Sequence, residues 1–353
     1  MKHYRIILVS QQVEKQKFHK MMNVKFLIFI LTGFIFAGGL LLCSNIKITE
    51  TPLEEELSDT NELKISKSFK ASPKHEIIIE SSIADVIMQS HDANEIEVNF
   101  YVKGLSQKLK EFDVSFHEEE NRLTIKVKRK KKVRILNFYD LFDLFQVEGI
   151  ETPQLVVKAP DSLSNVVIKS SGGDIKIQNF TSNFELSSAG GDIQIEELNG
   201  EIYASSSGGD TRIRNCRGDS KIKTAGGDII VSQYQGKIEI ESSGGDITVN
   251  KLNGSIFAFS AGGDVKVEFA LPLGTTKLST AGGDITIYAP SNLNAYVDLE
   301  SSGGNIKVDF PTRIEKKSSF ELKGWIGKQN SETTIKASSS GGDIELISKD
   351  MNI

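Results

Sequence analysis

The sequence predicts an all-β fold: a single-stranded parallel β-helix (β-solenoid) with 18-residue coils, preceded by one N-terminal hydrophobic helix. Three features predict it: a tripeptide that recurs at a fixed interval, apolar columns that recur with it, and glycines at two turns of each period. The tripeptide Gly-Gly-Asp starts six times at 18-residue intervals between residues 172 and 262, and again at residues 282 and 341. Gly-Gly-Asn starts at residue 303.

Each period carries the pattern of two short strands. Three and five positions after the first glycine, the residues are almost all aliphatic, as in Ile175 and Ile177, and the residue between them varies, as in Lys176. This alternation predicts a strand with one buried face. Further apolar columns lie eight positions after and four positions before the first glycine, and a Ser or Thr lies two before it. Ten positions on, glycines at 200, 218, 236 and 254 suit a turn with positive φ.

One coil is not expected to fold alone. Burying five or six medium side chains contributes on the order of 10 kcal/mol, whereas ordering each residue of a coil costs about 1.5 kcal/mol. Stacking equivalent residues of successive coils, roughly 4.8 Å apart, supplies the missing burial and hydrogen bonds.

Composition excludes several classes of protein. The chain has 353 residues and a net charge of −5, which indicates no general preference for nucleic acid. Its two cysteines, Cys43 and Cys216, cannot form a disulfide framework. Cys216 falls in an apolar column, so we expect a buried thiol.

The N-terminal segment resembles a membrane anchor or an export signal. Residues 1–25 are basic, and residues 26–43 hold a 17-residue uncharged apolar run ending at Leu42. Because the basic side comes first, we expect the rest of the chain to be exported. Three alternatives remain: an uncleaved signal anchor, a lipoprotein cleaved before Cys43, and a cleaved signal of a secreted protein. Residues 44–62 are polar and predict a tether.

Residues 63–160 predict irregular N-terminal coils. The stretch Ser81–Val86 matches Ser170–Ile175 as a degenerate repeat. Asp85 lies 89 residues before Asp174, close to five periods, so we expect the solenoid to begin here.

An insertion at residues 126–147 interrupts the strand pattern with a basic run and then an aromatic run. We expect it to pack on the solenoid or to cap it. The functional alternative is that this insertion contacts an anionic membrane or polymer. The candidate residues of that contact are Lys128, Arg129, Lys130, Lys131, Lys132, Phe138, Phe142 and Phe145.

We expect the regular solenoid, with a C-terminal cap, over residues 161–350. Phe310–Gly327 departs from the repeat and holds the only tryptophan, Trp325. Thr333–Ile347 is expected to be the last coil, at an end that covers the open sheet edge.

The repeated Ser-Ser-Gly-Gly-Asp-Ile motif resembles the bacterial putative-adhesin family of β-strand-repeat domains of unknown function. Ala159-Pro160 and the ending Gly324–Gly342, followed by Asp343-Ile344, share this resemblance, which covers residues 63–350. It implies a right-handed β-helix, commonly exported and membrane-attached. It implies no binding residues.

The motifs predict no catalytic, metal or cofactor site. The repeated Asp is expected to accept hydrogen bonds from turn N–H groups, with specific calcium binding as the alternative. The Ser/Thr column predicts a polar ladder, because all five histidines precede the regular coils. Outward Tyr203, Phe257 and Phe259 are the candidate contact surface.

These features together predict a non-enzymatic, membrane-anchored, exported scaffold or adhesin-like interaction module of the cell envelope. Its partners would be the membrane, through the N-terminal segment, and an envelope protein or polysaccharide, with no nucleic acid. One alternative is a β-helix that polymerises on the cytoplasmic face, and a weaker one is a carbohydrate-active enzyme.

Overall fold

The computed structural model describes residues 63–72, 75–102, 112–130, 152–161, 163–272 and 274–349. All of them belong to one compact unit, Leu57–Ile353. They form 25 strands that are joined into a single hydrogen-bonded sheet, and the described residues include no helix. The prediction of an all-β, solenoid-like domain is confirmed.

The regular coils run from β8 to β19. Most periods give one strand before the Gly-Gly-Asp turn and one after it. In two coils the second strand continues into the next period without a break, which makes β15 and β16 14 residues long. The bounds are β8 (Asn165–Ser170), β9 (Ile175–Phe180), β10 (Phe184–Ser188), β11 (Ile193–Leu198), β12 (Ile202–Ser206), β13 (Thr211–Arg217), β14 (Ser220–Thr224), β15 (Ile229–Ser242), β16 (Ile247–Ser260), β17 (Val265–Pro272), β18 (Thr275–Thr280) and β19 (Ile285–Pro290).

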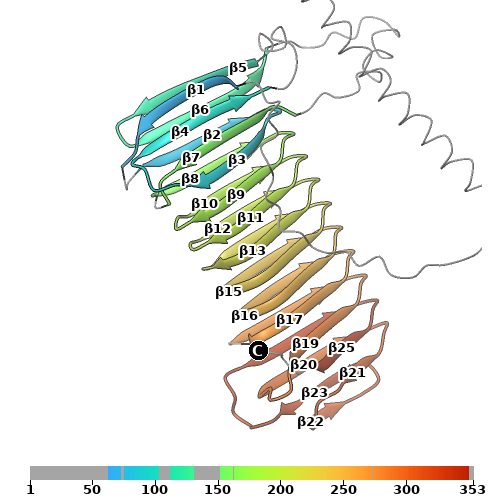
Figure 1. Ribbon diagram of the computed structural model, residues 1–353. Coiled ribbons are helices and arrows are strands. Elements are labelled where there is room, and N and C mark those ends of the chain that lie inside the picture. Colours follow the sequence, from blue (N-terminus) through green and yellow to red (C-terminus); the bar gives the residue numbers. More distant parts are fainter. Residues whose placement is uncertain are drawn as a thin grey trace, which may run out of the picture. The chain divides into compact units, whose positions relative to one another are not determined.

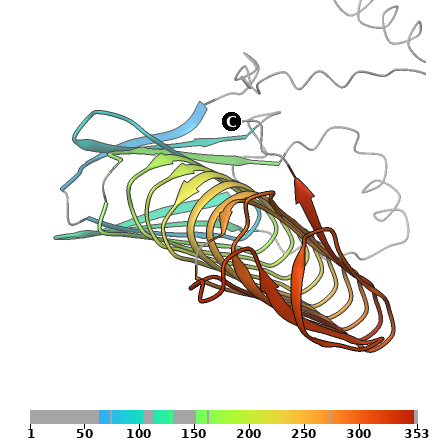
Figure 2. The ribbon, with the colours of Figure 1, turned by 90° about the horizontal axis from the view of Figure 1, so that it is seen from below.

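Equivalent strands of successive coils pair in parallel and form two ladders. In what we call the first ladder, Leu186 of β10 pairs with Ala204 of β12, which pairs with Ile222 of β14. In the second ladder, Ile193 of β11 pairs with Thr211 of β13. The partners lie 18 residues apart in these pairings. Figure 1 shows the strands following one another along the stack, and Figure 2 shows the coils repeating one outline.

The core lies between the two ladders. Along the strands buried residues alternate with residues that face outward, as in β9, where Ile175, Ile177 and Phe180 are buried. The apolar columns predicted from the sequence are buried, and Phe180, Leu198, Cys216, Tyr234 and Leu252 all have at most 2% of their surface exposed. Because the pattern repeats in every coil, one continuous core runs along the stack.

The second turn of each coil requires unusual backbone angles. The predicted glycines adopt positive φ, from 134° at Gly218 to 158° at Gly200. Three positions before each of them lies a residue other than glycine with φ between 53° and 56°. Each of these four coils thus places one side chain in the left-handed region, which the sequence pattern does not predict.

The first end of the stack is built from β1 to β7 and is partly antiparallel. β5 pairs antiparallel with β6, and β4 pairs antiparallel with both β1 and β7. The bounds are β1 (Leu63–Lys70), β2 (Glu76–Ser81), β3 (Asp85–Ser90), β4 (Glu95–Tyr101), β5 (Phe112–Glu119), β6 (Arg122–Arg129) and β7 (Gln154–Ala159). This end of the stack therefore departs from the parallel pairing of the regular coils.

The degenerate repeat at Ser81–Val86 lies directly against the first regular coil. Ser81 of β2 pairs with Ser170 of β8, and Val86 of β3 pairs with Ile175 of β9. The motif match is correct in register, and the 89 residues that separate Asp85 from Asp174 do not form five successive coils. Those residues instead supply β6 and β7, which pair with the outer side of β2 and β3.

The far end of the stack is also interleaved. β24 pairs with β18 on one side and with β20 on the other, and β25 likewise lies between β19 and β21. The coil at residues 334–349, expected to be last, is therefore an inner coil. β22 and β23 close this end as antiparallel strands. The bounds are β20 (Ala295–Ser301), β21 (Ile306–Val308), β22 (Thr312–Lys317), β23 (Glu321–Ile326), β24 (Thr334–Ser339) and β25 (Ile344–Lys349).

One buried position should be improvable by mutation. Thr211 stands between Ile193 and Ile229 in the second ladder, is fully buried, and its hydroxyl has no hydrogen-bond partner among the described residues. Thr211→Val keeps the shape and removes an unsatisfied polar group, so we expect a gain of about 1 kcal/mol in unfolding free energy. Urea denaturation measures it. Thr248→Val, at a half-buried outward position of β16, is the control and should change little. An unchanged or lower midpoint for Thr211→Val would contradict the expectation.

Candidate interaction surface

Two rows of outward side chains run across the strands of the first ladder. The upper row joins Tyr203, Lys221, Glu239 and Phe257, and the lower row joins Ser205, Lys223, Glu241 and Phe259, each residue paired with the next. Both rows project outward because the alternating residues Ala204, Ile222, Ile240 and Ala258 are buried. We call these two rows the aromatic–charged strip.

Ion pairs hold the charged part of the strip. Lys221 Nζ lies 3.3 Å from Glu239 Oε2 and 3.4 Å from Glu241 Oε1, and Lys223 Nζ lies 2.6 Å from Glu241 Oε2. Lys237, one row above, lies 2.9 Å from Glu239 Oε1. Each pair is largely exposed and contributes little to stability, but together they fix the positions of the side chains.

The same pairs lower the pKa values of the two glutamates. For Glu239 the main cause is the hydrogen bond from Lys237, and for Glu241 it is the hydrogen bond from Lys223. The pKa of Lys221 is raised, chiefly by its hydrogen bond to Glu239. A general acid needs a raised carboxyl pKa, so these glutamates do not fit that role.

Aromatic side chains flank the ion pairs. Tyr203 is 42% exposed and Phe259 is 47% exposed, and the Phe257 ring lies under Lys237, with 5.3 Å between Nζ and the ring centre. A shallow hollow of about 380 Å³ is lined by Phe257 and Phe259 together with the two glutamates. A second hollow of about 450 Å³ includes Tyr203. Aromatic side chains are enriched at binding surfaces, so these exposed rings are the candidate contact groups of the strip.

The repeated aspartates form a second ordered row, at the Gly-Gly-Asp turns. Each Asp Oδ1 accepts a hydrogen bond from the backbone N–H of the equivalent Asp one coil on, as from Asp192 to Asp174 at 2.8 Å and from Asp210 to Asp192 at 2.8 Å. Arg212 also bridges Asp192 and Asp210, at 2.8 and 2.7 Å. The prediction that these aspartates accept hydrogen bonds from turn N–H groups is confirmed. The repeated carboxylates therefore have a structural task in the stack.

The Ser/Thr column is a polar ladder inside the same turns. Ser188 Oγ donates to Gly191 O at 2.7 Å, and Ser206 Oγ donates to Gly209 O at 2.8 Å. These hydroxyls are buried and donate to backbone carbonyls of the turn. Their role is to close the turn.

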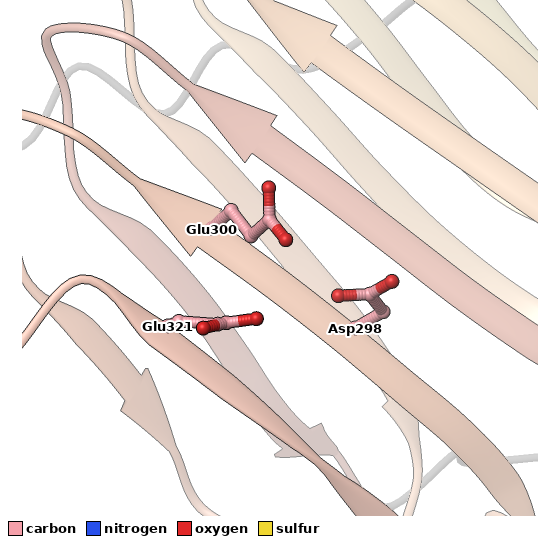
Figure 3. Close-up of side chains that lie close together, drawn as sticks. All are labelled: Asp298, Glu300 and Glu321. Atoms are coloured by element: carbon pink, nitrogen blue, oxygen red, sulfur yellow. The ribbon is translucent and has the colours of Figure 1, made fainter. Parts of the chain in front are cut away.

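At the far end of the stack, three carboxylates converge on one ammonium group. Asp298 and Glu300 project from β20 and Glu321 from β23, and Figure 3 shows the three side chains close together. Their ligand atoms lie within 4.8 Å of one another, as in a metal site. Lys323 Nζ lies 3.1 Å from Asp298, 3.1 Å from Glu300 and 3.0 Å from Glu321. Lys323 therefore already supplies the cation that this cluster needs.

Comparison with known proteins identifies the family of this chain. The model of the family described as Toastrack DUF4097 matches residues 74–347. The chain belongs to this family. The resemblance found in the repeated motif is thereby confirmed. No curated protein sequence matches the chain.

Solved structures similar to this Toastrack chain have low sequence identity to it. A "putative adhesin" from Bacteroides fragilis is 14% identical, with a TM-score of 0.42, and the match covers 81% of this chain and 97% of that one. A "putative lipid binding protein" from Parabacteroides distasonis is 12% identical, with a TM-score of 0.44 and coverages of 82% and 98%. A "putative adhesin" from the same organism is 15% identical, with a TM-score of 0.43 and coverages of 81% and 97%.

The structure places only some of the predicted site residues of this Toastrack chain. Tyr203, Phe257 and Phe259 lie on the same face of the first ladder, with β14 and β15 between Tyr203 and the two phenylalanines. Lys128 and Arg129 are exposed at the end of β6, and Lys130 lies 3.8 Å from Asp113 of β5. The other candidates lie outside the described residues: Cys43, Lys131, Lys132, Phe138, Phe142 and Phe145.

Cys216 is the buried thiol that the sequence predicts. It is 2% exposed, and burial raises its pKa to about 11. Such a thiol is unreactive at neutral pH. Within the described residues no helix has the length and apolar character needed to cross a membrane, and residues 26–43 lie outside them.

Removing the ammonium from the carboxylate cluster should destabilise the far end of the stack. Hydrogen bonds, first from Lys316 and second from Lys323, lower the pKa of Glu321 in the folded protein. Ionised Glu321 therefore stabilises the fold above its unfolded pKa of about 4.3, and this stabilisation is lost as the pH falls through the folded pKa. Lys323→Ala should lower the thermal midpoint at pH 7, because three carboxylates then repel one another.

The difference between wild type and Lys323→Ala should shrink as the pH falls below about 4.3, because protonated carboxyls no longer need the ammonium. Thermal denaturation at a series of pH values measures it. Lys307→Ala is the control, since Lys307 is 61% exposed and 3.8 Å or more from its acidic partners. A difference that is constant with pH would contradict the electrostatic explanation.

Proposed function

We propose that this protein is a non-enzymatic, exported and membrane-anchored β-solenoid, which acts as an adhesin-like interaction module or scaffold of the cell envelope. The observation that carries the proposal is the aromatic–charged strip: ordered aromatic and charged side chains displayed on the outer face of a continuous ladder. A right-handed winding of 18-residue coils is part of the proposal.

Physical chemistry favours binding over catalysis on this surface. The carboxylates of the strip are paired with lysines, which lower their pKa values, so neither has the raised pKa of a general acid. Tyr203 and Phe259 expose apolar surface that would lose water on contact with a partner. A partner with apolar faces and hydrogen-bonding groups, such as an envelope polysaccharide or protein, fits that surface.

Export and anchoring are supported by the sequence. The apolar run within residues 26–43 follows a basic segment, and this order favours an extracytoplasmic solenoid. Lipidation at Cys43, or secretion after cleavage, would also lead to export.

The ends of the first ladder favour this proposal over a polymerising scaffold. A solenoid that polymerises end to end needs open parallel edges, whereas β5 and β22 are antiparallel strands at the two ends of the first ladder. Both carry charged residues, with Glu118 and Glu119 on β5 and Lys316 and Lys317 on β22. Charges on an edge strand oppose strand addition.

Membrane sidedness tests the export part of the proposal. A tag placed after Ile353 is exposed to protease in intact cells, then after each envelope layer is opened. Loss of the tag while the cytoplasmic membrane is intact is the expected result. Protection until that membrane is lysed would overturn the proposal and favour a cytoplasmic scaffold.

Binding by the strip is tested separately. The triple variant Tyr203→Ala, Phe257→Ala, Phe259→Ala should reduce retention of the purified protein on isolated cell-wall polysaccharide at least about tenfold, which corresponds to 1.4 kcal/mol. Leu271→Ala is the matched control, because Leu271 is a 51% exposed apolar residue of β17, outside the strip. Equal retention of the triple variant and the wild type would exclude the strip as the polysaccharide contact.

A further inference from the structure

The far end of the stack holds a second outward aromatic group, separate from the aromatic–charged strip. Trp325 of β23 pairs with Tyr296 of β20 on one side and with Arg313 of β22 on the other. Directly paired residues of antiparallel strands project from the same face. Tyr296, Trp325 and Arg313 therefore form a row across three strands that lie far from β1, where the described chain begins (Figure 1).

Trp325 is held in a fixed orientation. Its indole Nε1 donates a hydrogen bond to Glu315 at 2.9 Å, and its ring packs edge-to-face on Tyr296 with the ring centres 5.0 Å apart. Trp325 nevertheless remains only half-buried. An aromatic ring that is fixed before binding loses little conformational entropy when a ligand contacts it.

A hollow of about 490 Å³ opens beside Trp325. Trp325, Phe310 and Pro311 supply apolar surface, and Ser291 and Asn292 supply polar groups. This volume falls within the usual range of small-molecule sites. The hollow fits a ligand that is apolar on one face and rich in hydrogen-bonding groups at its edges.

Arg313 determines the charge of that ligand. It is the only charged residue in the lining of the hollow, it is exposed, and it has no ion pair among the described residues. A guanidinium binds a carboxylate through two parallel hydrogen bonds. The fitting ligand is therefore anionic.

We propose that this hollow is a binding site for an acidic saccharide. The C–H face of the sugar ring packs on the Trp325 indole, whose face carries partial negative charge. The hydroxyls reach Ser291 and Asn292, and the carboxylate pairs with Arg313. This site does not depend on the strip or on membrane anchoring, so it can be tested on the purified protein alone.

The chain offers a direct reporter, because Trp325 is its only tryptophan. Tryptophan fluorescence is followed while oligogalacturonate is added to the purified protein, with a neutral malto-oligosaccharide and inorganic phosphate as comparison probes. We expect a saturable change with oligogalacturonate, and at least tenfold weaker binding of both comparison probes.

Arg313→Gln should weaken oligogalacturonate binding at least tenfold, and Arg313→Lys should recover part of it. Tyr203→Ala, in the strip, should leave the affinity unchanged. Isothermal titration calorimetry on Trp325→Phe supplies a readout that does not need the tryptophan, and we expect weakened binding.

Several results would overturn the proposal. One is the absence of a saturable fluorescence change with oligogalacturonate. Another is unchanged affinity in Arg313→Gln, which would remove the guanidinium from the site. Equal binding of inorganic phosphate would reduce the hollow to a simple anion site, and equal binding of the neutral sugar would remove the role of charge.

Discussion

Gly191→Ala should destabilise the protein by at least about 3 kcal/mol, whereas Gly190→Ala should cost less than about 0.5 kcal/mol. Gly191 is buried in the Gly-Gly-Asp turn, and a Cβ built on it would lie 2.3 Å from Gly173 O and 2.5 Å from Gly173 C in the preceding coil. Both atoms belong to the backbone, so no side chain can rotate away. Room for the methyl group would require two stacked coils to separate.

Gly190 provides the control from the same turn. It is exposed, and a Cβ there would have no neighbour closer than Ser171 O at 3.6 Å, which is an ordinary contact. Urea denaturation of both variants measures the difference. Similar midpoints would mean that successive turns are not stacked as closely as the structure shows.

Asp246→Ala should cost about 1–2 kcal/mol, because it interrupts the aspartate row in the middle of the stack. Asp246 Oδ1 accepts a hydrogen bond from the N–H of Asp264 at 2.8 Å, and Asp246 itself donates its N–H to Asp228 at 2.9 Å. Alanine keeps the second bond and loses the first. The N–H of Asp264 would then depend on water alone.

Asp246→Asn separates the hydrogen bond from the charge. Asparagine keeps an Oδ1 acceptor at the same place, so it should recover most of the stability lost in Asp246→Ala. Urea denaturation of the two variants is the measurement. If Asn were as destabilising as Ala, the negative charge would be the important property, and the calcium alternative for these carboxylates would gain weight.

The outward position of Tyr203, Phe257 and Phe259 follows from their places in the alternation. Their placement in two rows on one face, with β14 and β15 between Tyr203 and the two phenylalanines, follows from the parallel stacking. In contrast, the carboxylates Asp298, Glu300 and Glu321, with Lys323 among them, come from two strands that pair antiparallel. No local spacing relates the two strands, so the sequence could not predict the cluster. The same holds for the row of Tyr296, Trp325 and Arg313.

The regular coil follows from the sequence alone. The interval between Gly-Gly-Asp copies, the apolar columns, the glycine turns and the Ser and Asp rows all follow from it, because in a repeat each residue contacts its own equivalent in the next coil. The pattern along the chain is then also the pattern of contacts. The order of coils at the two ends is set by tertiary pairing and is not evident from the repeat.

The turn at Gly341 shows why the repeat alone does not fix the order of coils at the ends. Its motif has the same register as the turns at Gly282 and Gly303, so each of these coils could stack on either of the others. In the structure Asp343 donates its N–H to Asp284 at 2.7 Å and accepts from the N–H of Asn305 at 2.6 Å, which places it between the two. Equivalent repeats fit one another in any order, and the connections and antiparallel strands at the ends select one.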